Sequence, residues 1–178
     1  MKHLFFFFLS VVLISCSDFK KKEQLAQLTR FQKEVEQLNL DLKKNKIDTI
    51  ARIGLATSEV ELRIKNNLKS NTIDMVFGKK MDDYKRMRRS FAPLGGMYQK
   101  LKKEIEEERT ALMNLKTDIQ TGEGERKKYP DFISFESNKI MQLKELLKDY
   151  TLSKNNTMQT FFRLHPGLDS LSRALIKP

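Results

Sequence analysis

Histidine, cysteine and clustered carboxylates are the side chains most often used for catalysis or metal binding, and this chain has few of them. Its two histidines are His3, near the N-terminus, and His165, which directly precedes Pro166; Cys16 is its only cysteine. A transition-metal site normally needs three or four His, Cys or carboxylate ligands, and a Ser/His/Asp triad would have to be built around His165 alone. We therefore expect no metal, no cofactor and no enzymatic activity, and we interpret His165 as a helix-end residue.

The densest group of carboxylates consists of Glu104, Glu106, Glu107 and Glu108. Paired carboxylates can share a proton or bind a hard cation such as calcium. On a helix, positions 104 and 108 lie on one side, whereas 106 and 107 face elsewhere, and neighbouring Lys and Arg residues are within reach as ion-pair partners. We interpret the group as a solvated, salt-bridged helix face.

Basic residues are concentrated between positions 79 and 103, where nine Lys or Arg residues occur against only Asp82 and Asp83. Helical spacing places five of them on two neighbouring outward positions: Lys79, Arg86 and Lys100 on one, Arg89 and Lys103 on the other. Such a stripe is suited to anionic lipid headgroups, a cell-wall polymer or an acidic protein. The alternative is a face that only keeps the protein soluble.

The N-terminus has the order of residues found in a secretory signal. Lys2 precedes a mostly apolar run over residues 4–14, and the small residue Ser15 precedes Cys16. A membrane-spanning helix needs about 20 apolar residues, and the polar residues from Ser17 onward arrive too early. We therefore expect no transmembrane helix in the mature chain.

The four residues Leu13, Ile14, Ser15 and Cys16 resemble the lipobox of bacterial lipoproteins. The resemblance implies that residues 1–15 are a signal peptide and that the Cys16 thiol carries a covalent diacylglyceryl group, usually with a third chain on the new amino terminus. Two or more chains give durable anchoring. Ser17 resembles the outer-membrane sorting pattern of enterobacteria. An ordinary secretory signal with a chance cysteine is the alternative.

Three lysines, Lys20, Lys21 and Lys22, follow this anchor. Each Lys near an anionic surface contributes about 1 kcal/mol of attraction, so they are expected to contact headgroups or to serve as a charged tether. The rest of the chain, rich in Lys and Asn, resembles small helical lipoproteins of Bacteroidota in residues 115–119 and 164–166. That resemblance implies an envelope protein without indicating an activity.

Apolar residues recur at helical spacing through the whole chain. The spacing predicts a single domain over 16–178, with helices over about 17–45, 47–70, 72–121, 125–164 and 167–175. Asp48 and Thr72 are the expected N-caps, and Pro130 suits a first helical turn. Pro93 is interpreted as a kink in one long helix, because the heptad pattern continues across it; a break into two collinear helices is the alternative.

These lengths predict an all-α antiparallel helical bundle. The third helix would span roughly 70 Å and each of the first two roughly 35 to 40 Å. With short connections, the first two helices should pair and pack beside residues 73–91. The remaining hairpin, about Leu94 to Ile140, should project as an antiparallel coiled coil. Its Gly122 tip should point away from the membrane, and the C-terminus should return toward it.

The leading functional hypothesis is a membrane-anchored envelope lipoprotein that acts as a non-catalytic helical interaction or spacer protein. A holdase-type periplasmic chaperone and a binder of anionic lipid or cell-wall polymer are the alternatives. Export would remove nucleic acid from the partners, and no small-molecule substrate is evident. An apolar cavity or patch left uncovered would distinguish a chaperone from a spacer, which should bury its apolar stripes.

Overall fold

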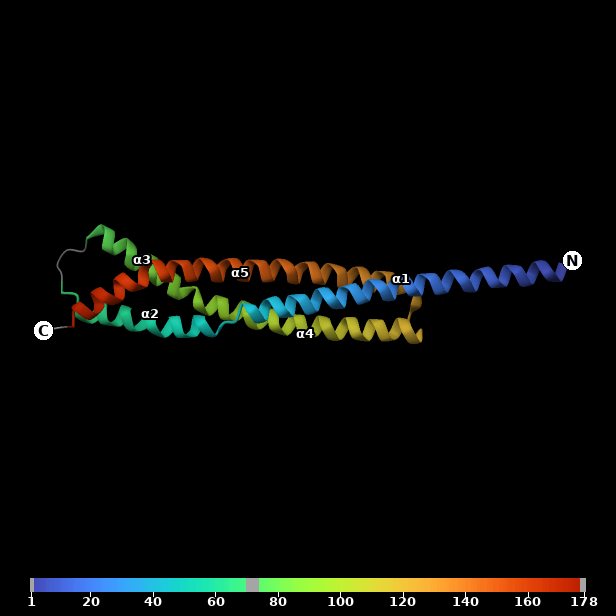
Figure 1. Cartoon of the computed structure of the whole chain (residues 1–178), viewed down its shortest axis with the longest axis horizontal. Coiled ribbons are helices and arrows are strands. Elements are labelled where there is room, and N and C mark those ends of the chain that lie inside the picture. Colours follow the sequence, from blue (N-terminus) through green and yellow to red (C-terminus); the bar gives the residue numbers. More distant parts are fainter. Residues whose placement is uncertain (1, 70–73, 177–178) are drawn as a thin grey trace. The chain divides into compact units, whose positions relative to one another are not determined.

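The computed structural model describes residues 2–69 and 74–176, with side chains described from Phe19 onward. Every regular element in these residues is a helix, which confirms the predicted all-α bundle (Figure 1). The elements are α1 Lys2–Lys44, α2 Asp48–Asn67, α3 Met75–Arg89, α4 Phe91–Thr121, the 3-10 helix η1 Arg126–Lys128, and α5 Tyr129–Ala174.

The chain divides into two compact units. Unit 1 combines Met1–Asp41 with Lys102–Glu145, and unit 2 combines Leu42–Leu101 with Leu146–Pro178. Helices α4 and α5 therefore contribute to both units, whereas α2 and α3 belong to unit 2 alone. The predicted apolar stripes form the core of each unit: nearly all of their described residues are buried or half-buried.

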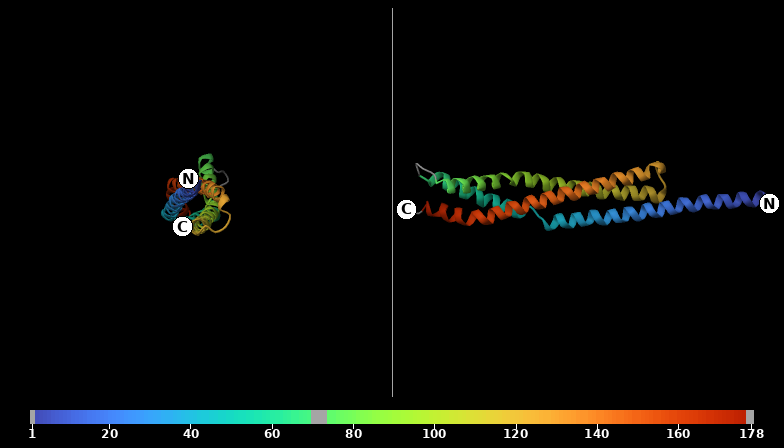
Figure 2. Two further views of the ribbon diagram at one scale, coloured as in Figure 1. Left: turned by 90° about the vertical axis from the view of Figure 1, so that its right-hand side faces the viewer. Right: turned by 90° about the horizontal axis from the view of Figure 1, so that it is seen from above.

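Unit 1 is a three-helix arrangement in which α1 lies along the hairpin of α4 and α5 (Figures 1 and 2). Lys21 Nζ donates a hydrogen bond to the Gln120 carbonyl at 2.8 Å, and Arg109 pairs with Glu36 at 3.3 Å. From Lys21 to Glu36 along α1 the contacts move back along α4 from Gln120 to Arg109, so these two helices are antiparallel. Glu34 pairs with Lys144 of α5 at 2.7 Å.

These contacts correct two expectations. The Gly122 turn was expected at the end of the hairpin opposite Lys20–Lys22, but the bond between Lys21 and Gln120 places it at the same end. The first two helices were expected to pair, but α1 packs in unit 1 and α2 in unit 2. The physical reason is that the apolar stripe of α1 covers the α4–α5 hairpin, which a two-stranded projection would have left half exposed.

In unit 2, α2 is antiparallel to α3. Their core contains Val60, Ile64, Tyr84 and Met87, completed from α5 by Leu164 and Leu168. The Tyr150 hydroxyl donates to the Asn45 carbonyl at 2.7 Å and so satisfies a carbonyl at the end of α1.

The long third helix predicted over 72–121 is divided at Ser90, which is the alternative of two successive helices. The Ser90 hydroxyl donates to the Met87 carbonyl at 2.6 Å and lies 3.1 Å from the Thr157 hydroxyl of α5. Pro93 is then the third residue of α4, within the first turn, where a missing N–H costs no intrahelical bond. The break at Ser90 therefore accommodates the proline.

Helix α5 does not end at His165, as the sequence suggested, but continues through Pro166 to Ala174. The predicted helices over 125–164 and 167–175 are thus one element. Proline removes a backbone donor, but burial of Leu164 and Leu168 on either side holds the segment on the core.

The predicted helix caps also differ. Thr72 lies outside the described residues, and the N-cap of α3 is Asp74, whose carboxylate accepts from the Val76 and Phe77 N–H groups at 3.2 and 3.4 Å. Asp48 is the first residue of α2 rather than its cap, and still favours the helix through the macrodipole.

Candidate functional sites

The predicted anchor, Cys16, lies outside the residues whose side chains the structure describes. The three lysines after it lie on α1, where Lys20 and Lys22 are exposed and Lys21 is half-buried. No described helix has the combination of length and apolarity that crossing a membrane requires.

The turn between α4 and α5 brings further cations to these lysines. Lys20, Lys21, Arg126 and Lys127, which we call the basic collar, line a cavity of about 480 Å³ together with Gly122 and Tyr129, and none of the described residues that line it is a carboxylate. Positive φ angles at Gly122 and Gly124 (77° and 75°) make the turn.

Hydrogen bonds fix the shape of this turn. Arg126 Nε donates to the Gly122 carbonyl at 2.8 Å, and the Tyr129 hydroxyl donates to the Asp118 carbonyl at 2.9 Å and also to that of Glu123. Carbonyls at the end of α4 attract cations through the helix dipole, which explains why Lys21 bonds to Gln120. The collar is therefore a local excess of positive charge on a rigid frame.

The predicted basic stripe is less uniform. All five of its residues are exposed, but Lys103 belongs to unit 1 and the others to unit 2. Arg86 is paired with Asp82 at 2.5 Å and Asp83 at 3.4 Å, and Lys103 lies 3.7 Å from Glu107. Neighbouring carboxylates therefore neutralise part of the stripe, which contrasts with the collar.

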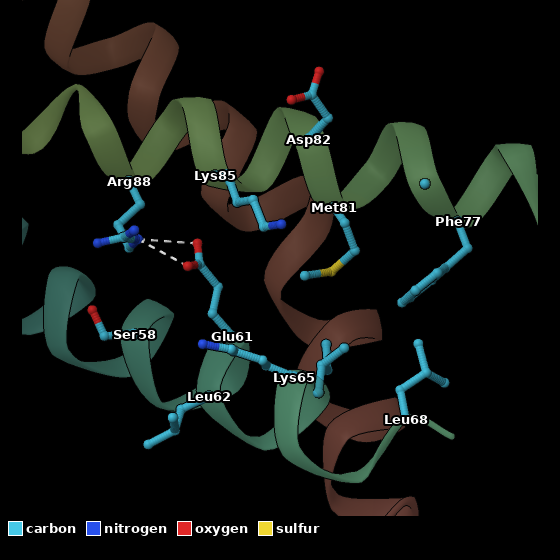
Figure 3. A pocket seen from close by; sticks show the side chains of 12 residues that line it. Ser58, Glu61, Leu62, Lys65, Leu68, Phe77, Met81, Asp82, Lys85 and Arg88 are labelled. Atoms are coloured by element: carbon cyan, nitrogen blue, oxygen red, sulfur yellow. Dashed lines mark hydrogen bonds and ion pairs between the residues drawn. The ribbon is translucent and has the colours of Figure 1, made fainter. Parts of the chain in front are cut away.

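A cleft of about 590 Å³ opens between α2 and α3 in unit 2 (Figure 3). Its apolar lining is Leu62, Ile64, Leu68, Phe77 and Met81, and its charged lining is Glu61, Lys65, Asp82, Lys85 and Arg88. In Figure 3 the Met81 and Phe77 side chains point from α3 toward α2. The apolar side of this cleft is the open edge of the unit 2 core, against which Leu68, Phe77 and Met81 pack.

The charges around this α2–α3 cleft are not equivalent. Glu61 is bound by Arg88 at 3.0 Å, and Asp82 is bound by Arg86 at 2.5 Å. Figure 3 shows Asp82 on the side of α3 away from α2. Lys65 and Lys85 are exposed, and neither has an ion pair within the described part of the chain.

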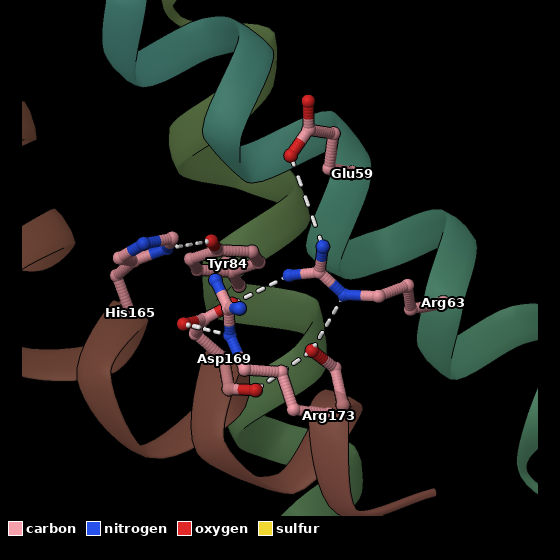
Figure 4. Close-up of polar contacts among 7 residues, drawn as sticks. Glu59, Arg63, Tyr84, His165, Asp169 and Arg173 are labelled. Carbon is pink, nitrogen blue, oxygen red and sulfur yellow. Dashed lines mark hydrogen bonds and ion pairs between the residues drawn. The ribbon is translucent and has the colours of Figure 1, made fainter. Parts of the chain in front are cut away.

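In unit 2, polar side chains form two hydrogen-bonded groups, one around Tyr84 and one around Arg63 (Figure 4). The Tyr84 hydroxyl lies 2.6 Å from His165 Nδ1, and Arg63 contacts Asp169 at 2.5 Å and the Ser172 hydroxyl at 3.0 Å. Burial raises the pKa of Tyr84 to about 12, and burial also lowers the pKa of His165.

Each of the two groups contains a buried hydroxyl. Tyr84 and Ser172 are fully buried, so no substrate can reach either hydroxyl without unpacking the unit. Because both pKa shifts favour the uncharged forms, Tyr84 and His165 form a neutral hydrogen-bonded pair. His165 is thus a core partner of Tyr84 inside α5, not the helix-end residue that the sequence suggested.

The acidic group is only partly a solvated face. Glu106 pairs with Arg109 of the same helix at 3.5 Å, as predicted, whereas Glu104 pairs with Lys139 of α5 at 3.2 Å. Glu108 instead is 3% exposed, and its Oε1 has no hydrogen-bond partner. Burial, with the neighbouring Glu136 carboxylate, raises the pKa of Glu108 to about 7. Position 108 lies three residues after Ile105 and four before Leu112, both buried, so it falls on the apolar seam of α4.

Among the described side chains, no three His, Cys, Asp or Glu residues gather as a metal ion would require. The described features are the basic collar, the α2–α3 cleft and the polar groups of unit 2, all carried on an all-α bundle. Comparison with protein-family models, with curated proteins and with solved structures gives no match.

Sequence reasoning missed most residues of both sites. Arg126 and Lys127 were predicted at a remote tip, so their proximity to Lys20 was not anticipated. For the α2–α3 cleft, the one signal in the sequence is Leu62, an apolar residue that lies off the buried stripe of its helix.

Proposed function

We propose that this protein is a membrane-anchored envelope lipoprotein that acts as a non-catalytic interaction protein, with unit 1 held at an anionic membrane surface and unit 2 offering a binding cleft. The anchor would be lipid on Cys16, in the outer membrane as Ser17 suggests. The observation that carries the proposal is the basic collar: Lys21 bonds to Gln120, so the α4–α5 turn lies beside the residues that follow the anchor.

The charge of the basic collar makes it a better candidate for the membrane contact than the basic stripe. Its four cations surround one cavity with no carboxylate among the lining residues, whereas Arg86 and Lys103 of the stripe are paired. Each cation near an anionic leaflet contributes about 1 kcal/mol. The collar therefore adds up to about 4 kcal/mol to what the lipid supplies, and salt should weaken that part.

Vesicle binding tests the collar. The predicted mature chain, residues 16–178, carrying Cys16→Ser and therefore no lipid, is sedimented with phosphatidylglycerol-containing vesicles and with pure phosphatidylcholine vesicles. We expect binding to the anionic vesicles alone, decreasing with salt. Arg126→Glu with Lys127→Glu should reduce the affinity about tenfold or more, since two attractions become repulsions.

The matched control is Lys79→Glu with Arg89→Glu, which reverses two exposed charges of the stripe. We expect little change. If the stripe variant loses binding and the collar variant does not, the stripe is the membrane contact and the proposed orientation is wrong. If neither variant changes binding to anionic vesicles, both surfaces are excluded.

The α2–α3 cleft supports an interaction protein rather than a plain spacer. A spacer should bury its apolar residues, whereas this cleft exposes part of the unit 2 core. Its volume of about 590 Å³ falls within the range of roughly 300–1,000 Å³ typical of small-molecule sites. The holdase alternative draws on the same opening, but a holdase requires a larger apolar surface. Suppression of aggregation of an unfolded outer-membrane protein by the full chain would support it over the interaction protein.

A further inference from the structure

The α2–α3 cleft is amphipathic in a way that selects a ligand. Its floor is formed by Ile64 and Leu68 of α2 and by Phe77 and Met81 of α3. Lys65 and Lys85 reach it from the two different helices. We infer that the cleft binds a single-chain lipid with a carboxylate head, a fatty acid, whose tail lies on this floor and whose carboxylate lies between Lys65 and Lys85.

The apolar floor of the cleft is continuous with the buried core of unit 2. Ile64 is 4% exposed, whereas Leu62, at the edge of the same cleft, is 58% exposed. The cleft thus leads from the surface onto the core of unit 2 rather than onto polar backbone. A tail placed there removes apolar surface from water on both partners, and each methylene buried contributes roughly 0.8 kcal/mol.

The charged residues around the cleft favour an anionic head group. Both carboxylates that line the cleft are already bound by arginines, Glu61 by Arg88 and Asp82 by Arg86. The two lysines are left as the net charge facing the opening. A bound carboxylate would replace their water with a charge-assisted contact, whereas an alcohol would gain less and a quaternary ammonium would be repelled.

This inference rests on the proposed function only in that a protein at a membrane surface meets such lipids. The fatty-acid site is independent of the basic collar, which has a different lining and lies in the other unit. Failure of one can therefore be measured without failure of the other.

The test uses the full chain in membranes of the cells that produce it. Three photoreactive probes share one alkyl chain with a diazirine and differ only in the head: carboxylate, alcohol or trimethylammonium. Labelled peptides are mapped by mass spectrometry, with and without excess unlabelled fatty acid. We expect the carboxylate probe to label the cleft peptides around Leu62 and Met81 about tenfold more than the other probes, with loss of label on competition.

Two double variants test whether Lys65 and Lys85 hold the carboxylate. Lys65→Gln with Lys85→Gln should reduce this labelling about tenfold, and Lys79→Gln with Lys80→Gln, on α3 but outside the cleft, should leave it unchanged. Circular dichroism checks that both variants fold.

Three results would overturn the inference. Equal cleft labelling by all three heads would show that the site selects only apolarity. Unchanged labelling in the Lys65/Lys85 variant would remove the lysines as the head-group site. Labelling confined to regions outside the cleft would exclude an acyl ligand there, while the vesicle experiment would still decide the function of the collar.

Discussion

Glu108 should make the stability of this protein fall as the pH rises. Its carboxyl is buried in unit 1, its Oε1 has no partner, and burial together with the nearby carboxylate of Glu136 raises its pKa from 4.5 to about 7. Glu136 is also shifted upward, mainly by burial, so the two carboxyls share one proton in the folded chain.

The direction follows from proton uptake. Below pH 4.5 both the folded and the unfolded chain keep the proton on Glu108, so the folded chain buries no charge at this position. Between the unfolded pKa of 4.5 and the folded pKa of about 7, only the folded chain keeps it, so stability is lost as the pH rises and levels off above about 7. At 1.36 kcal/mol per pKa unit the loss amounts to roughly 3 kcal/mol.

Glu108→Gln removes the titration while keeping the shape of the side chain. We expect the variant to match the unmodified chain near pH 5 and to exceed it by about 1 to 3 kcal/mol at pH 8. The measurement is urea unfolding followed by helical circular dichroism, on the full chain with Cys16→Ser. Glu107→Gln is the control, because Glu107 is exposed and its pair with Lys103 contributes little.

A difference between Glu108→Gln and the unmodified chain that is the same at both pH values would refute this reasoning. It would mean that Glu108 is charged, or uncharged, throughout, and that its burial is not coupled to a proton. A glutamine variant less stable at pH 8 would contradict it more strongly, because the unpartnered carboxylate would then be stabilising.

Three further substitutions test contacts within one or the other unit, and each is measured as a change in the free energy of unfolding. Tyr84→Phe should cost about 1 to 2 kcal/mol, since it leaves the half-buried Nδ1 of His165 without its partner; no loss would show that the pair is incidental. Gly122→Ala should cost about 1 kcal/mol or more, because φ is 77° there and the added methyl meets Arg126; Gly95→Ala, in open space within α4, should instead be neutral or stabilising. Arg63→Ala should cost about 1 to 3 kcal/mol by leaving Asp169 and the buried Ser172 without a shared partner, and a neutral result would show that the Arg63 group of Figure 4 does not stabilise unit 2.

The helices could be predicted from the sequence because their apolar residues recur at three and four positions. Leu28, Val35, Leu101 and Leu112 are each almost fully buried, as that spacing requires. The spacing carries no information on which helix covers which. The connection at 45–47 permits α1 and α2 either to pair as a hairpin or to pack separately. Which of the two occurs depends on which apolar stripe of α4 and α5 remains uncovered.

The sites were harder to predict for the same reason. The collar joins Lys20 to Lys127, more than a hundred positions away, and only the direction of α1 along α4 brings them together. The lysines of the cleft, Lys65 and Lys85, occur singly on two helices and stand out only when the open floor between them is known. Pro166 predicts a helix end, but α5 continues through it because burial on both sides of the proline outweighs its local helix-breaking tendency.

The measurement that tests the central proposal most directly is the mass of the N-terminal peptide of the protein extracted from its native membranes. We predict a mature chain that begins at Cys16 and carries the added mass of a diacylglyceryl group on that residue. If the new amino terminus is also acylated, the peptide carries the mass of a third chain. A chain that begins elsewhere, or an unmodified Cys16 in a protein recovered from the soluble fraction, would contradict it.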